Sequence, residues 1–212
     1  MPLEDAQKYP VFLDFATCSD VLATVIDYIK TIPVLTNNVP SGIRFVESNA
    51  AFDDKSDQLH DSQLYHIDYH SLPNVYVLVL LRDTTSENSP WTFLPRSVTR
   101  RVIRKLGYWT KTHGYRLSDD QVYSVAKREE AIEFTCKRGT VLFIESSGCL
   151  HFGSRNCVKP RFQLMLGYSG ICRTDFHETF AHWQNYSVRS EDSRLRKMVL
   201  TKNLLPKRNG TS

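Results

Sequence analysis

Three side chains in this sequence have the types and spacing of a metal-binding site. His66 and Asp68 stand two residues apart in a segment of strand-like composition. Side chains alternate across a strand, so both are expected on one face, where they can bind one ion. His151, in the turn-rich stretch 148–153, is the best candidate for a third ligand. Two histidines and one carboxylate are typical of the facial triad of non-haem Fe(II) oxygenases, which leaves three coordination positions open.

Further side chains near this triad suit the binding of organic ligands. Arg161 follows His151 by ten residues on the next expected strand. Its guanidinium can pair through two hydrogen bonds with a carboxylate, such as the distal end of a dicarboxylic cosubstrate. His70 continues the strand parity of His66 and is a candidate substrate contact, with a position at the pocket rim as the alternative. Trp91 is a second candidate, at the pocket wall, although core packing is the favoured interpretation for it.

Beyond these single residues, several motifs occur in the order found in a known family. They are His66-Ile67-Asp68, the stretch 87–97, Gly139, the stretch 151–156 and Arg161. Over residues 63–168 the sequence resembles the phytanoyl-CoA dioxygenase family. The resemblance implies a double-stranded β-helix (a cupin-like jelly roll) and an Fe(II)- and 2-oxoglutarate-dependent dioxygenase that uses O2 and releases succinate and CO2.

The resemblance also implies roles for particular residues. His66, Asp68 and His151 would bind iron, and Arg161 would bind the 5-carboxylate of 2-oxoglutarate. Ser154 and Gln163 stand near or at positions where the family has secondary cosubstrate contacts. The carboxylate of Asp68 implies hydroxylation or a similar oxidation, because related halogenases have a small residue there.

The elements expected to position these residues are mainly β, with flanking helices. Strands are predicted at 43–46, 63–69, 75–81, 91–94, 131–136, 140–145 and 161–168. Helices are predicted near 20–30, capped by Ser19 or Asp20, at 97–106, ended by Gly107, and after Ser118, which forms a capping box with Gln121. Helical patches are expected at 176–183 and 192–200, and an exposed loop at 53–61.

The chain length of 212 residues predicts one domain. We expect it to span residues 1–205, with the β-helix core at about 41–170, helical additions at both ends and a disordered tail at 206–212. Specificity is expected to reside in the segments before residue 63, at 82–90 and at 108–126.

Composition excludes several classes of protein. No apolar run approaches the roughly 20 residues of a membrane helix. Five cysteines without CxxC spacing, and an N-terminus without an apolar leader, predict a reduced cytoplasmic protein. The net charge of +4 does not indicate a nucleic-acid partner. The histidines at 177 and 182 are five residues apart, which does not match the four-residue spacing of a zinc-protease helix.

The expected activity is therefore oxidation of a small organic substrate. Two alternatives stay open at this point. One is a hydroxylase or demethylase of the same superfamily that acts on protein or nucleic acid, for which the basic stretch 96–111 would be the binding surface. The other is a non-catalytic cupin-like binding module, whose expected sign would be a missing metal ligand or a missing arginine.

Overall fold

The computed structural model describes residues 1, 3–35, 42–48, 59, 61–69, 72–110, 115–155, 157–170 and 184–201. The chain divides into two compact units. Unit 1 comprises Met1–Arg44, His70–Val75 and Leu166–Ser212, and unit 2 comprises Phe45–Tyr69 and Tyr76–Met165. The predictions for 176–183, for the tail 206–212 and for most of the loop 53–61 lie outside the described residues. The single domain over 1–205 stays a prediction.

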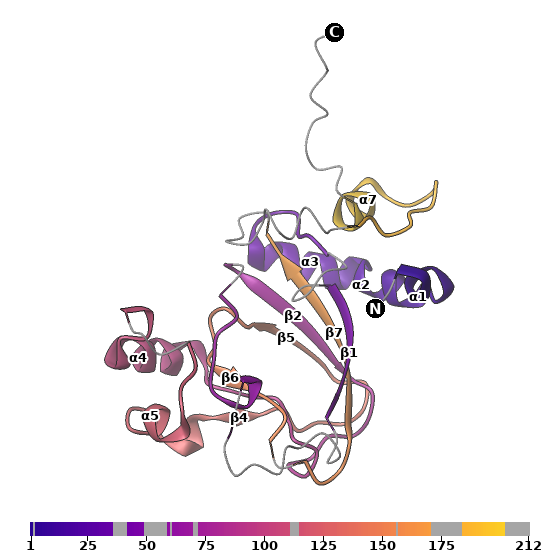
Figure 1. The fold of residues 1–212 in the computed structure, drawn as a ribbon. Coiled ribbons are helices and arrows are strands. Elements are labelled where there is room, and N and C mark those ends of the chain that lie inside the picture. Colours follow the sequence, from indigo (N-terminus) through magenta and orange to yellow (C-terminus); the bar gives the residue numbers. More distant parts are fainter. Residues whose placement is uncertain are drawn as a thin grey trace. The chain divides into compact units, whose positions relative to one another are not determined.

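The described chain contains two sheets with helices beside them (Figure 1). Four strands form a sheet in the order β1 (Gly42–Ser48), β7 (Arg161–Ser169), β2 (Asn74–Leu80) and β5 (Val141–Glu145). Three short strands form a second sheet in the order β4 (Ile132–Glu133), β3 (Thr92–Phe93) and β6 (His151–Phe152). The second sheet is antiparallel, with Phe93 opposite Ile132 on one side and opposite His151 on the other.

The strands β2 and β7 are the two central strands of the four-stranded sheet, and both are almost wholly buried. Every residue of β2 except Val79 is buried, as is every residue of β7 except Phe162. A strand covered on both faces is a continuous apolar run rather than an alternating one, as in β2. The strands predicted at 75–81 and 161–168 are both confirmed. The prediction at 131–136 is only partly right. Pairing with β3 is confined to two residues, although Phe134 N–H still donates to Trp91 O.

Residues 63–69 do not form the predicted strand, and the reason lies in their pairing. Gln63 ends a 3-10 helix (Asp61–Gln63). The residues that follow pair with three different segments: Tyr65 with Leu117, His66 with His151, and Asp68 with Ser146. Because each partner lasts for only one residue, no ladder forms.

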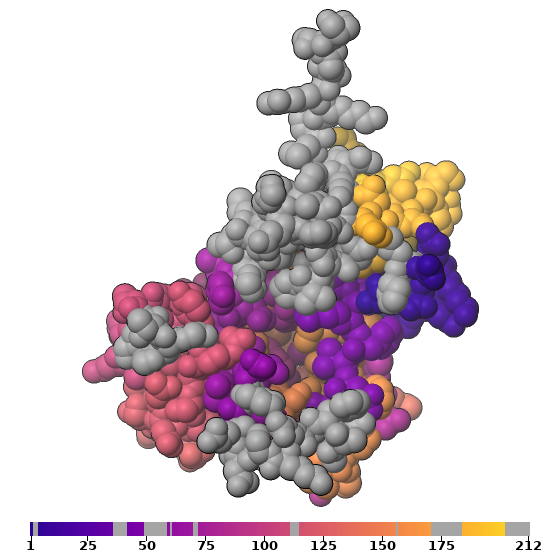
Figure 2. Space-filling model, in the orientation of Figure 1, coloured from indigo at the N-terminus to yellow at the C-terminus, as the bar shows by residue number. Residues whose placement is uncertain are grey.

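The helices of unit 2 confirm the capping signals of the sequence. Helix α4 (Arg96–Leu106) ends at Gly107, which adopts the left-handed conformation (φ 59°). Helix α5 (Asp119–Tyr123) begins with the complete Ser118–Gln121 capping box. Short 3-10 helices lie at Tyr108–Thr110 and Arg128–Glu130. The segment from α4 to α5 reaches the surface (pink in Figure 2), while its apolar side packs in one cluster with Tyr65, Ile67 and Leu150.

Unit 1 carries the helices α1 (Leu3–Lys8), α2 (Val11–Ala16), α3 (Ser19–Ile29) and α7 (Arg194–Leu200). The N-cap of α3 is Cys18, so the prediction of Ser19 or Asp20 as its cap was wrong by one or two residues. Ser19 is already helical, and Cys18 O accepts from Leu22 N–H at 3.0 Å. The prediction at 192–200 is confirmed from residue 194 onward, with Ser193 as the N-cap.

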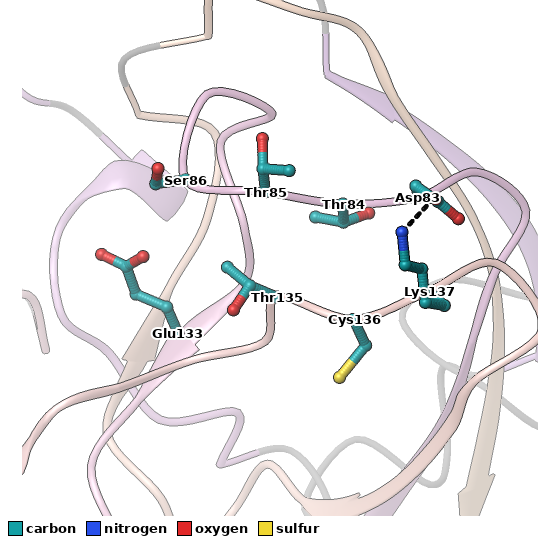
Figure 3. Close-up of a pocket in the computed structure, with 8 residues that line it drawn as sticks. All are labelled: Asp83, Thr84, Thr85, Ser86, Glu133, Thr135, Cys136 and Lys137. Carbon is teal, nitrogen blue, oxygen red and sulfur yellow. Dashed lines mark hydrogen bonds and ion pairs between the residues drawn. The ribbon is translucent and has the colours of Figure 1, made fainter.

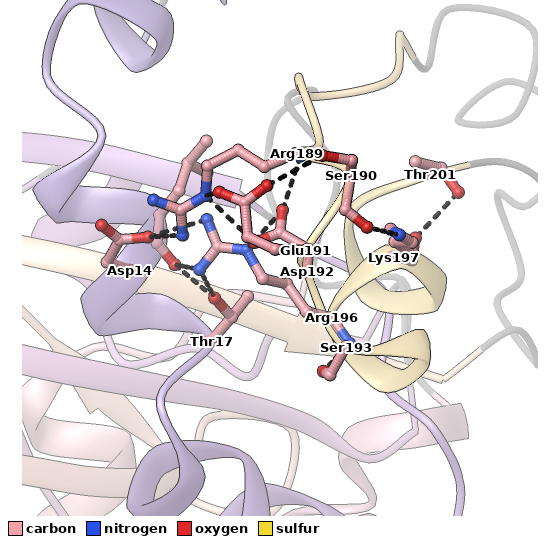
Figure 4. A network of polar contacts seen from close by, with 11 residues as sticks. Asp14, Thr17, Arg189, Ser190, Glu191, Asp192, Ser193, Arg196, Lys197 and Thr201 are labelled. Carbon is pink, nitrogen blue, oxygen red and sulfur yellow. Dashed lines mark hydrogen bonds and ion pairs between the residues drawn. The ribbon is translucent and has the colours of Figure 1, made fainter.

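A polar network joins α7 to α2 within unit 1 (Figure 4). Arg196 Nη2 lies 2.9 Å from Asp14 Oδ1, and Arg196 Nε lies 3.1 Å from Asp192 Oδ2. Arg196 Nη1 also donates to Thr17 Oγ1 at 2.5 Å. Arg189 binds both carboxylates, at 2.8 Å from Asp14 Oδ1 and 3.1 Å from Asp192 Oδ1. Two guanidinium groups and two carboxylates therefore fix the start of α7 against α2.

Candidate metal centre

Two histidines from distant parts of the sequence lie side by side in unit 2, with their ring planes tilted by 53°. His66 N–H donates to His151 O at 3.0 Å, and His151 N–H donates to His66 O at 2.9 Å. Residues directly opposite each other in such an antiparallel pair present their side chains on the same face. The two imidazole rings accordingly lie 4.4 Å apart between centroids. The backbone pairing thus brings two nitrogen ligands to one place.

The carboxylate of Asp68 completes the cluster. Its Oδ1 lies 4.0 Å from His66 Nε2, and its Oδ2 lies 3.5 Å from His151 Nε2. One ligand atom from each of these three residues lies within 4.8 Å of the others. An ion that binds about 2.0–2.2 Å from each donor atom requires these atoms to lie slightly closer together. A small inward shift of the side chains would bring them to that spacing. The structure therefore brings together the three residues that the sequence predicts as metal ligands.

Hydrogen bonds on the far side of each ring select the tautomer that a metal requires. His66 Nδ1 lies 2.8 Å from Leu64 O, and His151 Nδ1 lies 2.9 Å from Cys149 O. A carbonyl oxygen only accepts, so Nδ1 carries the proton in both rings. Each Nε2 is then left with a lone pair directed toward Asp68. Backbone carbonyls orient metal-binding histidines in this way in many proteins.

Both imidazoles are held in the neutral form. Burial, together with the neighbouring His151 and only partly opposed by Asp68, lowers the pKa of His66 to about 4. Burial also lowers the pKa of His151. A ligand nitrogen must be unprotonated to bind a metal, so at neutral pH the protons do not compete with an ion.

Arg161, at the start of β7, is a buried cation on the same unit. Its side chain is 2% exposed. Nη1 donates to Ser89 O, and Nη2 lies 3.4 Å from Ser48 Oγ. Burial lowers the pKa of the guanidinium to about 10, so it stays charged at neutral pH. Its Nε has no hydrogen-bond partner among the described residues. A buried charge in this state suits an anionic ligand.

Gln163 stands two residues beyond Arg161 on β7, on the same face of the strand. It is 1% exposed, and neither its amide oxygen nor its amide nitrogen has a hydrogen-bond partner within the described part of the chain. Buried polar groups are almost always hydrogen-bonded, so an unmatched donor and acceptor here indicate a polar ligand or ordered water. Both residues that the sequence assigns to the cosubstrate on β7 thus have unfilled hydrogen-bonding capacity.

Ser154 reaches Arg161 through a residue that sequence reasoning missed. Its Oγ lies 2.7 Å from Ser48 Oγ, which is the hydroxyl that Arg161 approaches. The contact depends on tertiary pairing of β1, and no local motif marks Ser48. Gly153 lies between Trp91 and Arg161, and a Cβ at that position would lie at ordinary van der Waals distance from both, 3.4 Å from Trp91 Cδ1 and 3.8 Å from Arg161 Nη2.

Trp91, which directly precedes β3, packs against His151 of the candidate metal site. Its ring centroid is 4.6 Å from that of His151 and 5.6 Å from that of Phe93, and the side chain is 6% exposed. The burial agrees with the core packing that the sequence offers as one interpretation of Trp91. Contact between Trp91 and a substrate stays a prediction. His70, the other expected substrate contact, lies outside the described residues.

A hollow elsewhere in unit 2 does not share this chemistry. Figure 3 shows a cavity of about 600 Å³ between the stretches 83–86 and 133–137. Its Asp83 carboxylate is already bound by Lys137 Nζ at 3.0 Å and by Arg138 N–H at 2.8 Å. None of its lining residues belongs to the histidine and aspartate cluster. The cavity is separate from the candidate metal centre.

The fold and the cluster together define a sheet protein with a candidate mononuclear metal centre. No protein-family model and no curated protein sequence matches the chain. Among solved structures, it is similar to EctD from S. alaskensis. The iron-bound EctD structure has a TM-score of 0.54 and 18% sequence identity, over 79% of this chain and 55% of EctD. The EctD apoform has a TM-score of 0.54 and 16% identity, over 89% and 63%. EctD with 2-oxoglutarate and 5-hydroxyectoine has a TM-score of 0.52 and 16% identity, over 77% and 54%.

This similarity shows a shared fold. The chain spans a little over half the length of the EctD chains that it matches. Among the described residues, no helix is long and apolar enough to cross a membrane.

Proposed function

We propose that the chain is an Fe(II)- and 2-oxoglutarate-dependent dioxygenase that oxidises a small organic substrate and releases succinate and CO2. One observation carries the proposal: two neutral imidazoles and a carboxylate converge in the same unit as a buried guanidinium with unfilled hydrogen-bonding capacity. A metal site alone would fit many functions, and Arg161 narrows the choice to one that also binds an anion. We further propose that the two sheets are the halves of a double-stranded β-helix.

The residues of the proposed site fall into two groups, one that would bind the metal and one that would bind the cosubstrate. His66 and His151 would bind the ion through Nε2, and Asp68 through its carboxylate, which leaves three positions open in an octahedral site. Fe(II) with 2-oxoglutarate and O2 supplies oxidation of a substrate C–H bond coupled to decarboxylation. The carboxylate at Asp68 supports hydroxylation rather than halogenation, as the family resemblance implies.

In the second group, Arg161 would bind the distal carboxylate of 2-oxoglutarate by charge-assisted hydrogen bonds. The Gln163 amide nitrogen would donate to the same group, and Ser154 would support it through Ser48. Trp91 packs on His151 and keeps water from that ring. The EctD structure that contains 2-oxoglutarate and 5-hydroxyectoine supports the idea that this fold holds such a cosubstrate beside a small molecule.

A reducing location fits this proposal. Every cysteine in the described residues is free: Cys18, Cys136, Cys149 and Cys157. Free thiols persist where glutathione and thioredoxin keep proteins reduced, and Fe(II) is stable under the same conditions. We therefore place the chain in the cytoplasm.

The test is formation of succinate from 2-oxoglutarate by the protein with Fe(II), O2 and ascorbate. We expect wild-type protein to form succinate with equal CO2, and Asp68→Ala to fall to the background of the protein-free reaction. Asp83→Ala is the matched control, because it removes an exposed carboxylate outside the cluster. Equal succinate from Asp68→Ala and wild type would contradict the metal assignment. Bound metal and 2-oxoglutarate without succinate, both alone and with a panel of small organic compounds added as candidate substrates, would favour a non-catalytic binding module.

A further inference from the structure

Arg116 lies beside the candidate metal centre, in the segment 108–126 where the sequence places specificity. Leu117 N–H donates to Tyr65 O at 2.9 Å, and Tyr65 N–H donates to Leu117 O at 3.0 Å. In an antiparallel pair the next residues outward also face each other, which sets Arg116 opposite His66. Opposite residues share a face, so Arg116 extends from the same face as His66 and His151.

The charge of Arg116 is not matched by an opposite charge within the described part of the chain. The side chain is half-buried, and its hydrogen bond is to the neighbouring carbonyl, from Nη1 to Tyr115 O at 3.3 Å. Among the described residues, no carboxylate forms an ion pair with it. After burial and other causes, its positive charge also contributes to the lowered pKa of both His66 and His151, which agrees with its place beside them.

This cation opposes the binding of a metal ion, since like charges repel across a partly desolvated site. Arg116 is therefore not explained by metal binding. Arg161 already supplies a buried cation for the cosubstrate, and its contacts are with a different set of residues, Ser48 and Ser89. A second arginine, half-exposed rather than buried, is left to meet a ligand that enters from solvent.

The backbone that carries Arg116 is held in a fixed and unfavourable shape. Tyr115 has a φ of 54°, which is rare for a residue with a side chain. Tyr108 Oη donates to Tyr115 O at 2.8 Å, and the Tyr115 ring lies 5.1 Å from the Tyr69 ring and 6.1 Å from the Trp109 ring. Strained backbone persists where surrounding contacts impose it, and such positions concentrate at ligand sites.

We propose that Arg116 binds an anionic group, a carboxylate or a phosphate, of the primary substrate and so positions the substrate at the metal. The proposal rests on the proposed function and adds the substrate class to it. The guanidinium would form charge-assisted hydrogen bonds to the anion, and Arg116 would be a specificity-determining residue.

The experiment measures anion binding by ligand-observed 19F NMR. The protein is loaded with Zn²⁺, which does not turn over, and saturated with 2-oxoglutarate so that Arg161 is occupied. The probes are 4-fluorobenzoate, 4-fluorophenyl phosphate and the uncharged 4-fluorobenzamide. We expect wild-type protein to bind at least one anion about tenfold more tightly than the amide, the size of one charge-assisted hydrogen bond. The tighter of the two anions tells whether the group is a carboxylate or a phosphate.

Three variants separate the charge of Arg116 from other effects. Arg116→Gln should remove the tenfold preference, and Arg116→Lys should keep part of it, which also shows that the site remains folded. Arg100→Gln removes a cation from the exposed surface of α4 and should leave the preference unchanged. Undiminished anion binding by Arg116→Gln would overturn the proposal, as would equal binding of anions and amide by wild type.

Failure of this proposal can be distinguished from failure of the proposed function. Loss of the anion preference in Arg116→Gln, with no succinate formed by wild type, would leave the anion site intact and reject the oxygenase. In the opposite case, wild type forms succinate, but the fluorinated anions bind only when 2-oxoglutarate is left out. That result would place anion binding at Arg161 and reject a role for Arg116.

Discussion

Replacement of Arg161 by methionine tests whether the buried guanidinium exists for a ligand or for the fold. Methionine has a similar length and fills apolar space without a charge. Arg161 is 2% exposed, and its Nε has no partner among the described residues. If the guanidinium serves a ligand, the ligand-free protein gains little from it, and the variant should fold about as stably as wild type.

The magnitude follows from the pKa and the hydrogen bonds. Burial lowers the pKa of Arg161 from 12.5 to about 10, which corresponds to roughly 3 kcal/mol against the charged form. The bonds to Ser89 and Ser48 offset this by about 1–3 kcal/mol. We therefore expect the stability of ligand-free Arg161→Met to equal or exceed that of wild type, within about 2 kcal/mol.

The ligand response should differ much more than the stability. At a 2-oxoglutarate concentration of about 100 times Kd, binding stabilises wild type by about 2.7 kcal/mol. For a chain of this size that raises Tm by about 5–10 °C. Arg161→Met should show no such rise, because the carboxylate has lost its cationic partner.

Thermal unfolding of the Zn²⁺-loaded proteins, with and without 2-oxoglutarate, measures both quantities. Arg100→Met is the control, since it removes an equal charge from an exposed position. Two results would contradict a ligand-binding role for Arg161. One is a rise in Tm of Arg161→Met equal to that of wild type, and the other is a loss of more than about 4 kcal/mol in the ligand-free variant, which would make Arg161 a structural residue.

Three further predictions concern pH and capping. The pKa of His66 is about 4 in the folded protein, against 6.5 for an ordinary histidine in an unfolded chain. Between these two pH values the unfolded chain binds more protons than the folded one. The metal-free protein should therefore keep its full stability above pH 6.5 and lose up to roughly 3 kcal/mol as the pH falls to 4. Urea unfolding at pH 7 and pH 4.5 measures this loss, and an unchanged loss in His66→Leu would contradict the assignment. Gly107→Ala should destabilise the protein by about 1 kcal/mol because of the left-handed backbone at the end of α4, seen as a lower urea midpoint. Ser118→Ala should cost about 1 kcal/mol through loss of the capping box, whereas Ser97→Ala, at an exposed position within α4, should not.

The parts that local sequence predicts well are those fixed by local physics. The apolar run of β2 and the glycine at the end of α4 determine their elements without reference to the rest of the chain. His66 and Asp68 could be paired because a two-residue spacing survives even where no regular strand forms. In contrast, the short helices α1 and α2 have six residues each, too few for a clear helical period.

The rest of the site depends on contacts between segments far apart in the sequence. Ser48 reaches Arg161 across 113 positions, and the hydrogen bond from Asp68 to Ser146 spans another long interval. Arg116 is set beside His66 by a bridge of one residue pair, for which the sequence contains no periodic signal. Residues that enter a site through such pairings are found only when the fold is known.

Anaerobic equilibrium dialysis with Fe(II) and 2-oxoglutarate can show whether His66, Asp68 and His151 bind iron beside a cosubstrate. It counts the metal and the cosubstrate bound to each chain, with no need for the substrate. We predict one Fe(II) and one 2-oxoglutarate per chain for wild type, and loss of the metal in His151→Ala. Iron binding that survives in His151→Ala, or the absence of bound iron in wild type, would contradict it.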